Sequence, residues 1–350
     1  SYVKKGWVVN FADASARLGF SPSVIYNYGK AVGSREMMDF AVYIHGNYDK
    51  MKFNVVRPLV WTDAFRSLES LKCMAEMDVL VDGLNDRILS GESFEDLMSS
   101  LRTSVPANVW YPETEFCYMR NTSGWFVAMK GGHNNESHNH NDIGTFTLYN
   151  DGVPMFIDAG VGTYTKSTFN KDRYTIWSMR SEWHNLPVIN GVFQHDGAVF
   201  RSSDVSVSFK KNANRFSLNI AGAYDEEAEC NFWKRNYLLK SDELVITDVY
   251  GLKSRDAADV ENFLVQGSVY LPGETTPEGY LVRNGETVVI NSDKKMLLIY
   301  PSVLTPSVKV MELTDPRMTS VWGSSLRRIS YTSAEDAPLS GKYVFKIKEF

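Results

Sequence analysis

Hydrophobic residues recur at the spacing of an α-helix through the first part of the chain. Between residues 37 and 44 they follow Ser34, a residue type that caps helix N-termini, and this pattern predicts a helix. Thr62 and Ser93 precede two further patterns of the same kind. The first part of the chain is therefore expected to be mainly helical.

The beginning of the chain fits the same interpretation. The apolar group from Trp7 to Phe11 suits the start of a packed helix, and Pro22 is expected to interrupt the helical pattern. After Pro106, short strand-like runs replace the helical spacing. We therefore predict a helical domain over residues 1–108 and a second domain over residues 109–350.

Short apolar and β-branched runs, separated by turn sequences, predict β-strands in the second domain. Asn150-Asp151-Gly152 separates two such runs, and residues of these types form tight hairpin turns. Further strand pairs are expected across residues 121–124, 240–243 and 284–285. Many short strands joined by tight turns favour an antiparallel β-sandwich. The expected fold class is α+β, with a helical domain followed by a large antiparallel β-sandwich.

Composition and charge exclude several classes of protein. With 43% hydrophobic and 23% charged residues, the chain has the composition of a globular protein with a large core. The net charge of −5 argues against a general nucleic-acid-binding protein. No apolar run approaches the roughly 20 residues of a membrane-spanning helix. Cys73, Cys117 and Cys230 are far apart and show no CxxC pattern, which argues against a disulfide framework or a thiolate zinc site.

One polar stretch has a composition that core packing does not explain. Residues 131–142 contain three of the six histidines, with asparagines and two carboxylates among them. Such groups are costly to bury unless they are paired or bind a metal. His138 and His140 on an extended segment would project from one face, because strand side chains alternate. The two rings would then share a site, or one would bind a metal while the other faces a substrate.

Asp158 and His184 are expected to complete a metal site with His140. The turn at residues 150–152 folds its second strand back beside the first, which brings Asp158 towards the histidine stretch. His184 supplies a third ligand from a later loop. Two histidines and one carboxylate, with an open position, suit Zn²⁺ or a similar divalent cation.

The polar residues around these ligands have two interpretations. In the first, Asn139, Asn141 and Asn185 orient the imidazoles of a metal site. In the second, the stretch is a polar loop whose hydrogen bonds are satisfied without a metal.

These motifs resemble the heparinase II/III-like polysaccharide lyases, a group that includes alginate and glycosaminoglycan lyases. The resemblance lies within about residues 124–197. It is carried by Gly131-Gly132, by His138-Asn139-His140-Asn141-Asp142-Ile143-Gly144, by Asp158-Ala159-Gly160 and by the segment from Arg173 to Asn185. It implies an (α/α) toroid followed by an antiparallel β-sandwich, with the substrate cleft between them.

The resemblance also implies roles for individual residues. Zn²⁺ would be held in the sandwich by the three ligands predicted above, while His138 faces the substrate. A tyrosine after the metal-binding aspartate approaches the site in this family. Tyr164 and Tyr174 both satisfy that order, and Tyr174 is favoured.

The activity implied is β-elimination on a uronic-acid polysaccharide such as a glycosaminoglycan or alginate. Elimination requires neutralisation of the carboxylate, a base, and an acid for the leaving group. His138 would serve as the base or in the neutralising set. Tyr174, with its pKa lowered by Arg173 and the metal, would exchange a proton. Arg173 is also the cation nearest the motif for binding substrate carboxylates or sulfates.

The helical part of this chain is much shorter than the toroid that the resemblance implies. We therefore expect the C-terminal portion of a longer enzyme, with the toroid-side catalytic residues before or near residue 1. The resemblance also implies a periplasmic or secreted location. Two other functions stay open: a zinc-dependent glycan hydrolase and a non-catalytic carbohydrate-binding fragment.

Overall fold

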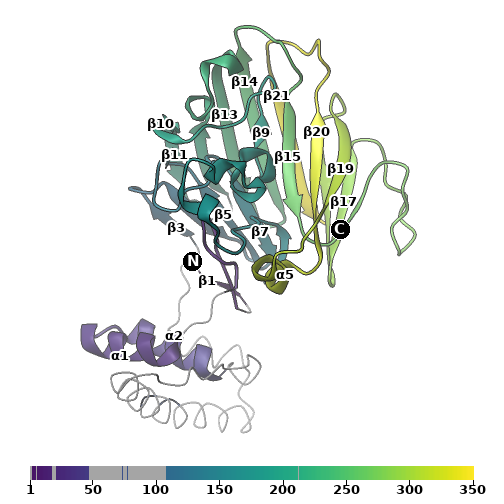
Figure 1. The fold of residues 1–350 in the computed structure, drawn as a ribbon. Helices are drawn as coiled ribbons and strands as arrows, with labels where there is room; N and C mark the ends of the chain where they lie inside the picture. Colours follow the sequence, from purple (N-terminus) through teal and green to yellow (C-terminus); the bar gives the residue numbers. More distant parts are fainter. Residues whose placement is uncertain are drawn as a thin grey trace. The chain divides into compact units, whose positions relative to one another are not determined.

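The computed structural model describes residues 2–4, 6–17, 21–46, 73, 77, 108–211 and 213–350. The chain forms two compact units, one of residues 1–18 with 107–350 and the other of residues 19–106. In Figure 1 the described part of the first unit is a layered structure of β-strands. The division into functional domains at residue 108 stays a prediction, although residues 1–18 group with the strand-rich unit.

The larger of two main sheets has nine strands. Its order is β19-β20-β15-β8-β7-β5-β4-β3, and β9 pairs with β15 beside this path. In chain order its strands are β3 (Asn108–Tyr111), β4 (Phe116–Arg120), β5 (Trp125–Lys130), β7 (Phe146–Asn150), β8 (Val153–Phe156), β9 (Pro187–Val188), β15 (Val260–Val265), β19 (Thr305–Glu312) and β20 (Ser325–Thr332).

The second main sheet has eight strands in the order β11-β12-β13-β14-β21-β18-β17-β16. In chain order they are β11 (Ser203–Ser208), β12 (Asn214–Asn219), β13 (Cys230–Leu239), β14 (Glu243–Leu252), β16 (Ser268–Tyr270), β17 (Glu286–Asn291), β18 (Lys294–Ile299) and β21 (Ser340–Glu349). The described strand pairs within both sheets are antiparallel, as expected from the turn-rich sequence.

Smaller elements connect these sheets and cover them. They are β1 (Tyr2–Lys4) paired with β2 (Trp7–Val8), β6 (His133–Asn134) paired with β10 (Gly197–Arg201), the helix α5 (Pro316–Trp322), and the 3₁₀ turns η2 (Lys166–Phe169), η3 (Arg173–Thr175), η4 (Trp177–Met179), η5 (Ser181–Trp183), η6 (Ala221–Ala223) and η7 (Glu226–Ala228).

Aromatic side chains fill the space between the two main sheets. Phe263 on β15 meets Phe345 on β21 with ring centroids 5.0 Å apart, and Phe146 on β7 meets Tyr237 on β13 at 5.6 Å. These rings belong to one buried cluster with residues of both sheets. Burial of such large apolar surfaces is the main source of stability for a sandwich.

The outer face of the nine-stranded sheet is also covered, in part by the N-terminal residues of the chain. Trp7 stacks on Trp322 of α5 at 5.3 Å and lies 5.9 Å from Tyr149 of β7. The expected helix start at Trp7–Phe11 is therefore wrong, because Trp7 lies in β2. Its apolar side chain packs on a sheet whose strand β5 is buried on both faces.

Most of the predicted hairpins are confirmed. The Asn150-Asp151-Gly152 turn joins β7 to β8, and residues 121–124 join β4 to β5. The expected hairpin across residues 284–285 is wrong, because β17 pairs with β16 and β18 instead. The apolar residues before that turn contribute only an isolated bridge between Leu281 and Thr275.

In the unit of residues 19–106, the structure describes two helices, α1 (Pro22–Val32) and α2 (Arg35–Gly46). The helix expected after Ser34 is thereby confirmed. Pro22 begins a helix rather than interrupting one, because a first-turn N–H needs no intrahelical acceptor. The helices predicted near Thr62 and Ser93 lie outside the described residues. Among the residues that are described, no helix is both long and apolar enough to cross a membrane.

Candidate metal centre and active site

The histidine stretch forms a loop between β5 and β7 that is pinned by buried polar contacts. Lys130, the last residue of β5, and Asp142 form a completely buried ion pair at 2.5 Å. Gln194 closes the far side of the loop, since its side chain accepts the N–H of Ile143 at 3.0 Å and donates to the carbonyl of Ile143 at 2.7 Å. The polar composition of the loop is thus partly explained by contacts that fix its path.

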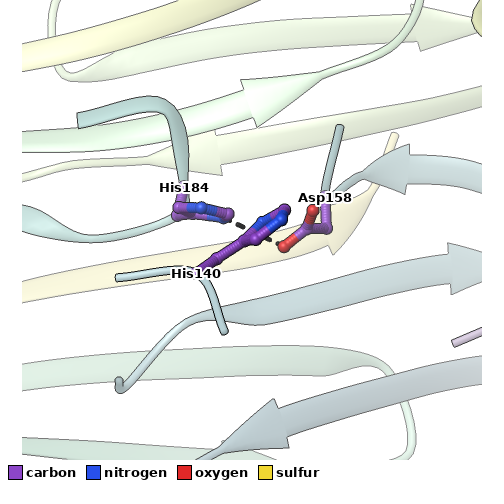
Figure 2. A group of neighbouring side chains, drawn as sticks. All are labelled: His140, Asp158 and His184. Carbon is purple, nitrogen blue, oxygen red and sulfur yellow. Dashed lines mark hydrogen bonds and ion pairs between the residues drawn. The ribbon is translucent and has the colours of Figure 1, made fainter. Parts of the chain in front are cut away.

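His140, Asp158 and His184 converge as the sequence predicts. Each offers one ligand atom, and these atoms all lie within 4.8 Å of one another. Figure 2 shows the three side chains directed towards a common point. The Nδ1–H of His184 donates to Asp158 Oδ2 at 2.9 Å, and the rings of His140 and His184 lie 5.4 Å apart. All three side chains are buried.

Local structure explains why these residues meet. Asp158 follows β8, which the β7–β8 turn returns beside β7, and its Oδ1 accepts the N–H of Gly160 at 2.7 Å. His184 follows η5, and the next residue, Asn185, bonds the carbonyl of Ile157 at 3.1 Å. Two loops that are distant in sequence are therefore held together by a hydrogen bond from the Asn185 side chain to a backbone carbonyl.

The pKa values of the two buried rings are shifted in opposite directions. Burial lowers the pKa of His140, and its hydrogen bond to Asp13 offsets this only in part. Burial also opposes the charged form of His184, but the nearby Asp158 outweighs it and raises the pKa of that imidazole. Burial disfavours the charge of Asp158 as well, yet His184 keeps the pKa of the carboxyl below its usual value.

Asp13, which the sequence analysis did not single out, joins the cluster to the rest of the site. His138 Nδ1–H donates to its Oδ2 at 2.9 Å, while His140 Nε2–H and Arg173 donate to its Oδ1 at 3.1 Å and 2.7 Å. Burial opposes the charge of Asp13, but these three donors hold the pKa of its carboxyl well below the usual range. The carboxylate is thus a shared acceptor for both histidines of the HxH motif.

The HxH motif itself differs from the expected extended segment. His138 has a φ of 61°, in the left-handed region, so the two rings are not placed by strand alternation. Instead they meet at the two oxygens of Asp13. The His140 side chain is completely buried, whereas that of His138 is 54% exposed. His140 therefore lies inside the site and His138 at its accessible edge, while both rings contact Asp13.

Two cavities adjoin His138 and contain the predicted tyrosines. His138, Arg173 and Tyr174 line a cavity of about 380 Å³. His138, Asp13 and Tyr164 line a second one of about 310 Å³. The other three candidate catalytic residues therefore line cavities beside the accessible imidazole of His138, with Tyr174 and Tyr164 on different cavities.

One electrostatic expectation, for Tyr174, needs correction. Burial raises the pKa of Tyr174. Asn139 and Arg173 act in the opposite direction but do not reverse the shift, so the expected net lowering is not found. The guanidinium of Arg173 also bonds the carbonyls of Asn139 at 2.9 Å and Thr168 at 2.7 Å, in addition to Asp13. Its donors are directed largely at the protein.

The predicted asparagine contacts to the imidazoles are wrong. Asn139 Nδ2 donates to the Tyr174 hydroxyl at 3.4 Å, and Asn141 Nδ2 donates to the carbonyl of Gln194 at 3.1 Å. Asn185 donates to the carbonyls of Phe146 and Ile157. The amides of Asn141 and Asn185 fix backbone segments, because loop carbonyls that are buried need donors. The carboxylate of Asp13 supplies the contact to the rings.

The residues of the cluster fit a divalent cation on their own geometry. His140 Nδ1 and His184 Nε2 are buried, and neither has a hydrogen-bond partner among the described residues. Because the Nε2–H of His140 donates to Asp13, its Nδ1 carries a lone pair. Neutral imidazole nitrogen and carboxylate oxygen are ligands that Zn²⁺ prefers.

The fold and the site define an antiparallel β-sandwich protein with a buried His-Asp-His cluster beneath an accessible histidine. The sequence model of the family described as "Heparinase II/III-like, C-terminal" matches residues 104–311, and the chain belongs to this family. No curated protein matches the chain in a sequence comparison.

Solved structures share the fold at low sequence identity. A heparinase III with methylated lysines is 13% identical with a TM-score of 0.54, and the match covers 98% of this chain and 52% of that one. The heparan sulfate lyase HepC from Pedobacter heparinus is 10% identical with a TM-score of 0.52, covering 94% and 52%. A further heparinase III is 15% identical with a TM-score of 0.55, covering 94% and 52%. The chain thus spans about half the length of these relatives.

Proposed function

We propose that this chain is the C-terminal part of a polysaccharide lyase that cleaves a uronic-acid-containing polysaccharide by β-elimination. The observation that carries the proposal is the placement of His138. Its ring is half exposed between two cavities, and its Nδ1–H donates to the buried carboxylate of Asp13. In the neutral form of the ring, the lone pair is therefore on Nε2.

The proposed reaction removes the C5 proton of the uronate and breaks the C4–O4 bond. His138 Nε2 accepts the proton, the electron pair of the C5–H bond forms the C4–C5 double bond, and O4 leaves with a proton. Tyr174 suits the donation of that proton, because burial raises its pKa and keeps the phenol protonated. Tyr164, on the second cavity, is the alternative tyrosine.

Asp13 and Arg173 are proposed to position these groups. Asp13 accepts from His138, which fixes the ring in the tautomer that a base requires. Arg173 is 2.7 Å from Asp13 and bonds the backbone of Asn139, next to His138. A second proposed role for Arg173 is to offset the charge of the substrate carboxylate.

Zn²⁺ is the proposed cofactor, held by His140, Asp158 and His184. When bound, it would supply positive charge and rigidity beneath the site. The proposal extends to three features inferred from the family: residues 19–106 as the end of an (α/α) toroid, further catalytic residues on the toroid, and a periplasmic or secreted location.

The test is an elimination assay with heparan sulfate, chondroitin sulfate, hyaluronan and alginate. Cleavage of one of them should produce the ultraviolet absorbance of an unsaturated uronate. His138→Ala should abolish it, by about 100-fold or more if general-base catalysis is lost. His195→Ala is the matched control, because the His195 side chain is also 54% exposed but lies outside both cavities that contain His138.

The outcomes separate the competing functions. New reducing ends without absorbance would indicate a zinc-dependent hydrolase and overturn the lyase proposal. Binding without any cleavage by the full-length protein would indicate a non-catalytic carbohydrate-binding protein. Equal activity of His138→Ala and His195→Ala would remove His138 from the mechanism.

A further inference from the structure

A third cavity, of about 410 Å³, lies at the opposite end of β5 from the histidine loop. It is formed where the turns β4–β5, β11–β12 and β13–β14 come together. The histidine loop begins after Lys130, whereas the β4–β5 turn precedes Trp125. Six residues of extended chain separate the two ends by about 20 Å, so this cavity is distinct from the proposed active site.

The lining of this cavity is basic, although the whole chain carries a net charge of −5. Arg120, Lys210, Lys211 and Lys240 line it, and no carboxylate of the described residues does. Lys240 is paired with Glu243 at 2.6 Å. No ion pair of Lys210 or Lys211 occurs within the part of the chain that the structure describes. Several like charges around one hollow favour binding of an anion.

The cavity also offers contacts suited to a sugar. Phe209 is 41% exposed and lines it, which provides an apolar surface for a ring face. Asn108 Oδ1 is buried and has no hydrogen-bond partner among the described residues. A hydroxyl donor would satisfy that oxygen, whereas an inorganic anion, which only accepts hydrogen bonds, would not.

Hydrogen bonds between turns of the two main sheets hold the rim of this cavity in place. Asn121 Nδ2 donates to the carbonyls of Lys240 at 2.9 Å and Ser241 at 3.1 Å. Ser123 Oγ donates to the same Ser241 carbonyl at 2.6 Å. β3 and β11, whose neighbouring turns and strand ends build the cavity, are the edge strands of their sheets and lie at the same side of the sandwich in Figure 1. A rim tied in this way is organised before a ligand binds.

We propose that this cavity is a second glycan-binding site that takes an acidic sugar unit bearing a carboxylate or sulfate. Lys210 and Lys211 would contact the anionic group, Phe209 the ring face, and Asn108 a hydroxyl. The choice of a saccharide rests in part on the proposed function. Such a site, remote from the cleavage point, would hold a long polymer chain while another part of it is cut.

The experiment is calorimetric titration of a heparin-derived tetrasaccharide into the full chain carrying His138→Ala, which prevents cleavage of the probe. The double variant Lys210→Ala/Lys211→Ala in that background should lose one binding event or weaken it by about tenfold or more. Lys342→Ala/Lys346→Ala is the control, since it removes the same charge from exposed positions on β21.

Further titrations determine the chemical class of the ligand. Asn108→Ala should weaken tetrasaccharide binding without changing the affinity for inorganic sulfate. A neutral maltotetraose that binds equally well would overturn the requirement for an acidic sugar. Sulfate that binds as tightly as the tetrasaccharide would reduce the site to a simple anion site and overturn the proposal.

Failure of this proposal is distinguishable from failure of the lyase proposal. Unchanged tetrasaccharide binding by Lys210→Ala/Lys211→Ala would overturn the second site, whatever the activity of the protein. Absence of cleavage by the unmodified protein would instead contradict the proposed catalytic role of His138. The result of the binding measurement would still be valid. The two experiments use different residues and different readouts.

Discussion

At the scale of single residues, Asp13 is the group on which the candidate site depends most. It is 7% exposed, and its two oxygens accept hydrogen bonds from both histidines of the HxH motif and from Arg173. A carboxylate behind a metal-binding imidazole fixes the orientation of the ring and raises its basicity. Asp13 therefore links the buried cluster to the accessible His138.

Replacement of Asp13 by asparagine should weaken both functions of this link. We expect Zn²⁺ affinity to fall by about 10–100-fold, because the imidazole of His140 loses its anionic partner. The elimination rate should fall at little cost in KM, since His138 loses its orientation. Zn²⁺ competition with a chelator and steady-state kinetics would measure the two effects.

Asp172→Asn is the matched control for that experiment. Asp172 is exposed, and its carboxylate is not part of the Asp13 network. If Asp13→Asn behaved like this control in both assays, the positioning role of Asp13 would be wrong.

Two thiols, the buried Cys117 and the partly buried Cys230, give a second prediction at this scale. Burial raises the pKa of Cys117 to about 12 and that of Cys230 to about 12. At pH 8 both groups should be neutral thiols, which are poor nucleophiles. Iodoacetamide should therefore modify them slowly in the folded protein and rapidly after unfolding in guanidinium, as peptide mass spectrometry can determine. Rapid modification of the folded protein at pH 8 would contradict the raised pKa values of these thiols.

At the scale of elements, two loops owe their positions to a buried arginine on β13. Arg235 bonds Asp248 and Glu261 through 2.8 Å and 2.6 Å contacts and donates to the carbonyl of Asn185 at 2.9 Å. It also reaches the carbonyl of Gly144 at 3.4 Å. Gly144 ends the histidine loop and Asn185 follows His184, so this guanidinium supports both loops from within the sandwich.

Arg235→Met should therefore destabilise the sandwich strongly. Removing one partner leaves buried carboxylates without their counter-charge, which typically costs about 3–5 kcal/mol. Urea unfolding of the variant would measure the loss. Lys234→Met, one residue earlier on the same strand with a side chain 54% exposed, should change stability little. Similar stability of the two variants would contradict the structural role of Arg235.

The turn after Asp158 is equally constrained. Gly160 has a φ of 67°, and a Cβ there would lie 2.7 Å from the carbonyl oxygen of Ala14 and 3.1 Å from Asn10 Nδ2. Asn10 in turn donates to the carbonyl of Asp158 at 2.9 Å. The segment that contains Asp13 thus approaches this turn too closely for any side chain at residue 160.

Gly160→Ala should destabilise the protein by about 1–3 kcal/mol and weaken Zn²⁺ binding, because it strains the backbone and displaces the segment with Asp13. Gly273→Ala is the matched control. Gly273 has a φ of 87°, but a Cβ added there would meet nothing within 4 Å, so this variant tests the backbone strain alone. The two variants would be compared by thermal unfolding and by metal titration. Equal effects on metal binding would contradict the close approach of the segment with Asp13 to residue 160.

At the scale of the whole molecule, metal binding is expected to stabilise the sandwich unit. A ligand at 100 times its dissociation constant adds about 2.7 kcal/mol to the folded state. Chelation of Zn²⁺ should therefore lower the melting temperature by several degrees, and added Zn²⁺ should restore it. Differential scanning calorimetry at fixed protein concentration would record the shift.

His184→Ala should melt at the same temperature with and without chelator, because one of the three ligands is lost. His195→Ala should retain the full shift, since it lies outside the cluster. If neither chelator nor added Zn²⁺ changed the melting temperature of the unmodified protein, this would count against a structural metal.

Features of the site that arise from neighbouring residues could be predicted from the sequence, whereas those that depend on distant segments could not. The polar composition of residues 131–142 singled out the histidine stretch, and the turn at residues 150–152 correctly returned Asp158 towards it. The role of Asp13 could not be seen in the same way. It lies 125 residues before His138, in a segment whose apolar pattern resembles an ordinary helix start.

The sequence by itself determined the local structure: tight turns and β-branched runs require antiparallel hairpins, and unpaired imidazoles and carboxylates require partners. Only the tertiary structure decided where Trp7 packs, and hence that Asp13 reaches both rings of the HxH motif. The physical reason is that hairpin formation depends on neighbouring residues, whereas the covering of a sheet face depends on which distant apolar segment buries the most surface there.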